Sequence, residues 1–70
     1  MRITINGEIK TFEPKEISAT LENLITHLDY DPRLIVVEFN GTILTPEHWK
    51  QQKVQDGDSI EIVTIVGGGN

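Results

Sequence analysis

The sequence contains no cysteine and few basic residues, with 6 Lys+Arg against 11 Asp+Glu among its 70 residues. Without cysteine the chain forms neither a disulfide framework nor a thiolate metal site, so apolar packing has to stabilise the fold. The net charge of -5 has the wrong sign for binding a phosphate backbone, which requires Lys and Arg. These absences argue against nucleic acid as a partner.

Long apolar runs are also missing from the sequence. No stretch approaches the roughly 18 apolar residues of a membrane-spanning helix, and Met1–Thr4 is not followed by the apolar core of a signal peptide. We therefore expect a cytoplasmic, monomeric protein that does not contact membranes. A chain of 70 residues has room for one small domain. We assign residues 1–66 to that domain and residues 67–70 to a flexible glycine-rich tail.

Alternation of apolar and polar residues predicts the strands, and two Asn-Gly pairs predict the turns between them. Asn6-Gly7 and Asn40-Gly41 each supply the positive φ angles of a type I′ turn, so each is expected to join a β-hairpin. Asp56–Asp58 is a further turn signal. The predicted strands are residues 2–5 and 8–12, then Leu34–Phe39, Thr42–Leu44 and Ile60–Val66.

One amphipathic helix is predicted after Ser18, whose side chain is suited to cap it. The apolar residues that recur at the spacing of one helix face are Leu21, Leu24, Ile25 and Leu28. Pro46, after a capping Thr45, predicts a short helical turn that ends at Trp49. A helix between two groups of strands predicts an α+β fold: a mixed sheet of four to five strands with one helix packed across one face.

The period-2 rule assigns the strand side chains to two faces of this sheet. Those expected to face the helix are Ile35, Val37, Phe39, Ile60, Ile62 and Val66. Glu38 and Glu61 are expected to face water, and the apolar residues on their side are Leu34, Val36, Val63 and Ile65. An apolar patch that no helix covers indicates a partner-docking site. The alternative is that Trp49 or the loops around it cover these residues.

No set of side chains in the sequence converges on catalytic chemistry. His27 and His48 lack further ligands at metal-binding spacing, so no metal site is expected. Gly67–Gly69 are not followed by the Lys-Ser or Lys-Thr of a phosphate-binding loop. Three glycines after an apolar strand instead form a thin segment that could carry a carboxyl group into the active site of a partner, or simply fray.

Taken together, these features resemble the ThiS family, the sulfur carriers of thiamine biosynthesis. The resemblance covers nearly the whole chain and depends on Pro46–Trp49, on Asp56–Asp58 before the last strand, and on the closing Val66–Gly69. It implies a ubiquitin-like β-grasp fold. It also implies a carrier protein that is not an enzyme and has no bound cofactor.

The resemblance further implies a reaction sequence carried out by partner enzymes. A ThiF-like activating enzyme uses ATP to adenylate the terminal glycine, and a sulfur donor derived from cysteine desulfurase chemistry converts the adenylate to a thiocarboxylate. A ThiG-like thiazole synthase then receives the sulfur. In this sequence Gly69 would carry the thiocarboxylate, Gly67 and Gly68 would deliver it, and Leu34, Val36, Val63 and Ile65 would dock on the partner. Glu38 and Glu61 would steer a basic partner toward the patch.

The chain departs from the family pattern at its end, because Asn70 follows Gly69. We expect Asn70 to be removed so that the carboxylate of Gly69 becomes available; removal of two residues would give Gly68 that role. Two other functions are compatible with the residues. One is the small-subunit sulfur carrier of molybdopterin synthase, and the other is a ubiquitin-like interaction module without sulfur chemistry.

Overall fold

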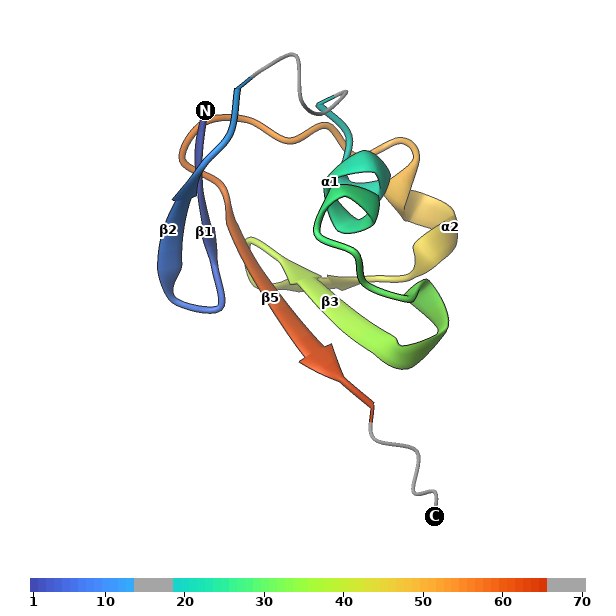
Figure 1. Ribbon diagram of the computed structural model, residues 1–70. Helices are drawn as coiled ribbons and strands as arrows, with labels where there is room; N and C mark the ends of the chain where they lie inside the picture. The colour runs from blue at the N-terminus through green and yellow to red at the C-terminus, as the bar shows by residue number, and fades with distance from the viewer. Residues whose placement is uncertain (14–18, 66–70) are drawn as a thin grey trace.

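The structure, a computed structural model that describes residues 1–13 and 19–65, is a mixed sheet with helices on one side (Figure 1). The elements in chain order are β1 (Arg2–Ile5), β2 (Glu8–Thr11), α1 (Leu21–His27), the 3-10 turn η1 (Pro32–Leu34), β3 (Ile35–Phe39), β4 (Thr42–Leu44), α2 (Pro46–Trp49) and β5 (Ser59–Thr64). The predicted α+β architecture, a mixed sheet with one main helix across it, is confirmed.

The sheet has the strand order β2-β1-β5-β3-β4, which places the last strand of the chain in the centre. β5 is parallel to β1 and antiparallel to β3. The two outer pairs are the predicted hairpins, and their Asn-Gly turns have φ angles of 52° and 83° at Asn6 and Gly7 and of 50° and 88° at Asn40 and Gly41. The glycine-rich end of the chain therefore follows the central strand in the sequence, separated from Thr64 by two residues.

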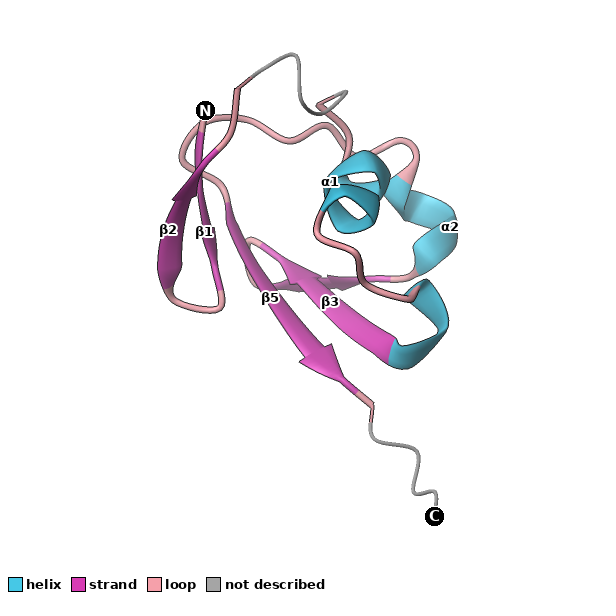
Figure 2. Cartoon of the chain, in the orientation of Figure 1, coloured by secondary structure: helices cyan, strands magenta, loops and turns pink. Residues whose placement is uncertain are grey.

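The core lies between α1 and the face of the sheet that α1 covers (Figure 2). The residues predicted to face the helix from β3 and β5 are buried, as expected for Ile35, Val37, Phe39, Ile60 and Ile62; Val66 lies outside the described residues. Trp49 is only 2% exposed, and its indole N–H donates to the carbonyl oxygen of Leu44 at 2.9 Å. The side chains of Leu34, Val36, Val63 and Ile65 remain exposed, so the alternative that Trp49 or the loops around it cover them is wrong.

The start of α1 differs from the prediction. The N-cap is Thr20 and not Ser18, because Thr20 has extended backbone angles and its Oγ1 accepts a hydrogen bond from the Asn23 N–H at 3.3 Å. The N–H of Leu21 donates to the carbonyl oxygen of Gln52 at 2.8 Å. This long-range contact satisfies one of the free N–H groups of the first turn and fixes where the helix begins.

Two other boundaries and one capping interaction also differ. Leu34 belongs to η1 and not to the third strand, since Pro32 opens a 3-10 turn there. The last strand spans Ser59–Thr64 and so ends before the predicted Val66. Thr45 occupies the N-cap position of α2, but its hydroxyl lies 2.9 Å from Nδ1 of His48 and caps no backbone N–H.

We expect Thr20→Ala to lower the free energy of unfolding by about 1 kcal/mol, the usual cost of losing an N-cap side chain. Thr26→Ala is the matched control, because the Thr26 hydroxyl donates to the Glu22 carbonyl oxygen within the same helix and caps nothing. Urea unfolding of both variants measures the difference. Equal losses of stability would contradict the capping role of Thr20.

Candidate functional site

Exposed apolar side chains gather where β3 and β5 run side by side, on the sheet face opposite α1, which we call the open face. Leu34 is 49% exposed, Val36 37%, Val63 61% and Ile65 48%. Val36 lies directly opposite Val63 in the strand register, and the N–H of Ile65 donates to the carbonyl oxygen of Leu34 at 2.6 Å. These four residues, the open-face patch, thus form two cross-strand pairs beside the end of β5.

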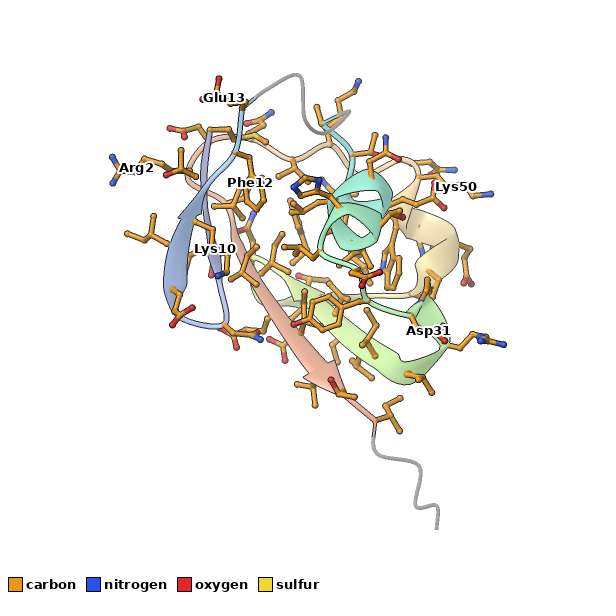
Figure 3. All side chains as sticks on the ribbon, viewed as in Figure 1. Arg2, Lys10, Phe12, Glu13, Asp31 and Lys50 are labelled. Atoms are coloured by element: carbon orange, nitrogen blue, oxygen red, sulfur yellow. The ribbon has the colours of Figure 1, made fainter. Side chains whose placement is uncertain are left out.

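An ion pair fixes the turn that carries Leu34. Asp31, which is labelled in Figure 3, accepts from the backbone N–H of Arg33 at 3.0 Å. The Arg33 guanidinium makes a bidentate contact with the same carboxylate at 3.1 and 2.9 Å. These hydrogen bonds lower the pKa of Asp31 and raise the pKa of Arg33. Both groups therefore stay charged around neutral pH, and the turn is held in place next to the patch.

Two carboxylates border the open-face patch. Glu38 and Glu61 are exposed and lie directly opposite each other in the register of β3 and β5. Within residues 1–13 and 19–65, neither side chain has an ion-pair partner. Like charges in this position oppose strand pairing. The two carboxylates therefore place unpaired negative charge beside the open-face patch at some cost to strand pairing.

The apolar character of the open face extends beyond the four predicted residues. Ile9 is 63% and Ile43 62% exposed. Their register partners are Thr4 and Glu38, which alternate with buried residues along β1 and β3, so both isoleucines lie on the open face. The sequence contains the signal that would have identified them, because a two-residue turn at each Asn-Gly pair sets the register of both hairpins.

The other end of the open face carries a shallow hollow of about 280 Å³. Its lining consists of Arg2, Thr4, Ile9, Asp56 and Gly57. The backbone N–H of Arg2 donates to the Asp56 carboxylate at 2.6 Å, and that of Gly57 donates to the Arg2 carbonyl oxygen at 2.8 Å. These bonds tie the last turn to β1, and the lining offers no nucleophile paired with a base.

The remaining titratable candidates have structural neighbours. His27 makes an edge-to-face contact with Phe12 at a centroid distance of 5.6 Å, and His48 contacts Thr45. In the part of the chain that the structure describes, no three His, Asp or Glu side chains are placed to hold a metal ion. Among the same residues, no helix has the length and apolar character needed to cross a bilayer. Gly67, Gly68, Gly69 and Asn70 lie outside the described residues.

A five-stranded mixed sheet with one main helix across it and an uncovered apolar face defines a ubiquitin-like β-grasp protein. Within that class, the sequence model of the ThiS family matches residues 3–69. The chain belongs to the ThiS family.

Known proteins of similar sequence and structure agree with this assignment. The chain is 31% identical to the sulfur carrier protein ThiS of Bacillus subtilis over 96% of this chain and 98% of that protein. The crystal structure of the thiamine biosynthesis protein ThiS from Geobacter metallireducens superposes with a TM-score of 0.80 at 31% identity, covering 99% of this chain and 100% of that one. A thiazole synthase of Paramagnetospirillum magneticum is 40% identical over all 70 residues, which span only 21% of that protein.

Proposed function

We propose that the protein is a sulfur carrier of thiamine biosynthesis and that Gly69, after removal of Asn70, carries the sulfur as a thiocarboxylate. Membership of the ThiS family and the nearly full-length similarity to the Bacillus subtilis carrier support this function. The family match ends at residue 69, one residue before the end of the chain. The observation that carries the proposal is that the central strand β5 ends at Thr64 beside an exposed apolar patch and that three glycines follow two residues later in the sequence.

The chemistry depends on a leaving group that the chain itself does not provide. A ThiF-like enzyme would transfer AMP from ATP to the Gly69 carboxylate and release pyrophosphate. A persulfide derived from cysteine desulfurase chemistry would then add to the carbonyl carbon and expel AMP, which gives an acyl disulfide. A thiol would cleave this acyl disulfide by exchange, which leaves the thiocarboxylate and oxidises the thiol to a disulfide. Glycine at this position removes the side chain that would hinder the approach of the nucleophile. The carrier contributes docking and delivery, and its partners contribute the catalysis.

The open-face patch is the surface that we assign to docking on a ThiG-like thiazole synthase. Its two apolar cross-strand pairs lie beside the end of β5, so a partner bound there is close to the residues that follow. The thiazole synthase of Paramagnetospirillum magneticum contains a region similar to this whole chain. Joining two modules in one polypeptide raises their effective concentration, which supports thiazole synthase as the partner.

The direct test is the intact mass of a form that ends at Gly69 after incubation with a ThiF-like enzyme, ATP and a sulfide source. We expect an ATP-dependent species in which sulfur replaces one oxygen, and an alkylating reagent that reacts with thiocarboxylates should label only this species. Protein recovered from its own cells should show the same species without Asn70. If an enzyme that activates the Bacillus subtilis carrier leaves both the form that ends at Gly69 and the form that ends at Gly68 unchanged, sulfur carriage is excluded and an interaction module is favoured.

Neutralising the two carboxylates beside the patch is expected to slow association more than it weakens the complex. Because Glu38 and Glu61 attract a basic partner before contact, the double variant Glu38→Gln/Glu61→Gln should bind thiazole synthase about fivefold more slowly at low salt. Stopped-flow association at several ionic strengths measures this effect.

The matched control for this charge effect is Glu8→Gln/Glu47→Gln, which removes two exposed carboxylates from β2 and α2. This control should keep the wild-type salt dependence. If the Glu38→Gln/Glu61→Gln variant also keeps it, the two carboxylates do not steer the partner.

A further inference from the structure

The end of β5 runs past the β1–β2 hairpin and has a neighbouring strand on one side only (Figure 1). β1 pairs with β5 at two positions, Thr4 with Ser59 and Ile5 with Ile60. β3 accompanies β5 over five positions, as far as Thr64. Among the residues that the structure describes, β1 therefore pairs with the first half of β5 on this edge, and no strand pairs with the second half.

Hydrogen bonds along β5 show which backbone groups face β3. The carbonyl oxygen of Ser59 accepts from the Asn40 N–H at 2.8 Å, and the N–H of Ile65 donates to the Leu34 carbonyl oxygen at 2.6 Å. Successive residues of a strand direct their backbone groups to alternate sides. The backbone N–H and C=O groups of the odd-numbered residues of β5 thus point toward β3. Those of the even-numbered residues point toward the edge on which β1 pairs.

Asn6, directly after β1, makes the last hydrogen bonds between this part of the chain and β5. Its N–H donates to the Ile60 carbonyl oxygen at 2.9 Å, and its side-chain oxygen accepts from the Ile62 N–H at 2.7 Å. The side-chain carbonyl takes the place of the main-chain acceptor that a continuing parallel strand would supply. The ladder therefore ends on a side chain, although β5 itself continues.

Three backbone groups of β5 lie beyond this point on the same edge: the C=O of Ile62 and the N–H and C=O of Thr64. None of them has a hydrogen-bond partner within residues 1–13 and 19–65. Thr64 is exposed. Buried or covered backbone groups are almost always paired. The three groups of this short edge therefore need hydrogen-bond partners, which either another strand or water can supply.

The outer edges of the sheet are protected, in contrast to this one. β4 has only three residues, and β2 carries the exposed pair Glu8 and Lys10, whose charged groups lie 3.6 Å apart. Short strands and charged side chains, lysine above all, are the usual means of preventing unwanted strand pairing. The edge of β5 at Ile62–Thr64 is also short, but unlike β2 it carries no charged side chain.

We propose that this edge receives an extended segment of thiazole synthase, which adds as a strand beside Ile62–Thr64. A segment parallel to β5, as β1 is, would donate one N–H to the Ile62 carbonyl oxygen and accept from the Thr64 N–H. Val63 belongs to the open-face patch, so a partner that covers the patch already lies next to the edge. The inference rests on the proposed function and names a second contact through which the same partner is held.

Amide hydrogen exchange tests the added strand directly. In the free protein, the Thr64 N–H should exchange fast, while the Ile62 N–H should be protected by its bond to Asn6. In the complex of the full chain with thiazole synthase, exchange at Thr64 should slow by at least about tenfold. Thr64 exchange that stays unchanged in a formed complex would overturn the added strand. Absence of any complex would instead contradict the proposed function.

Two variants of Thr64 distinguish a hydrogen bond from its N–H to the partner from a contact that only shields the strand from water. Thr64→Pro removes the N–H on the unpaired edge of β5, a position where proline is tolerated. Thr64→Ala removes the side chain but keeps the N–H. Thr64→Pro should bind thiazole synthase about tenfold more weakly than Thr64→Ala. If proline unfolds β5, an ester bond in place of the Thr64 amide removes the same donor and should weaken binding equally. Equal binding of the donor-deleted and donor-retaining forms would overturn the proposal.

Discussion

A form of the protein that ends at Gly69 is expected to become a thiocarboxylate in the presence of a ThiF-like enzyme, ATP and a sulfur donor, whereas the 70-residue chain is expected to remain unmodified. The reason is that the free carboxylate of the longer chain belongs to Asn70. Its side chain occupies the space that a glycine leaves open for the attacking nucleophile. Intact mass spectrometry of both forms, side by side, measures the difference as the presence or absence of the sulfur-containing species.

Two control forms assign this effect to the last glycine. Gly69→Ala in the shortened chain should be modified poorly, because it restores a Cβ next to the reacting carbon. A form that ends at Gly68 tests whether removal of two residues produces the active carrier. Equal modification of the 69-residue and 70-residue forms would refute the requirement for trimming. Activity of only the form that ends at Gly68 would transfer the carrier role to that residue.

The hairpins of this fold could be predicted because their signals are local. Each Asn-Gly pair supplies the two positive φ angles of its turn within two adjacent residues, and both turns form as expected. The strand order could not be obtained in the same way. The parallel pairing of β1 with β5 joins residues from the two ends of the chain, and no short sequence pattern encodes such a contact.

The residue that caps α1 is determined by a tertiary contact. Ser18 and Thr20 both have side chains suited to cap a helix. The bond from the Leu21 N–H to the Gln52 carbonyl oxygen selects Thr20, because it requires that the first turn begin at Leu21. Gln52 is far away in the sequence, so the capping preference alone could not identify the correct residue.

The open-face patch could be predicted to a large extent, because alternation around two outward-facing glutamates determines the side of each neighbour. Alternation within the third and last strands does not reach Ile9 and Ile43, whose side of the sheet depends on the registers of the two hairpins. The role of the patch remains a prediction. The vacant edge beside Thr64 was not accessible from sequence, because it depends on where β1 ends relative to β5.

Val63→Asp is expected to weaken binding to thiazole synthase by about 30-fold or more, the effect of losing a central interface residue. Val63 forms the cross-strand pair with Val36 in the open-face patch. A carboxylate there would have to be desolvated on docking, next to the negative charge of Glu61. Isothermal titration calorimetry of the folded variant with thiazole synthase measures the change in affinity.

Ile9→Asp is the matched control, because Ile9 lies on the same open face and is exposed to nearly the same extent, 63% against 61% for Val63. It lies on β2, which β1 separates from β5. Both substitutions place one new carboxylate on a solvent-exposed strand position, so their effects on folding should be similar. If binding depends on the patch beside the end of β5, only Val63→Asp weakens it strongly. If both variants lose affinity equally, the partner covers the whole open face; if neither does, docking uses another surface.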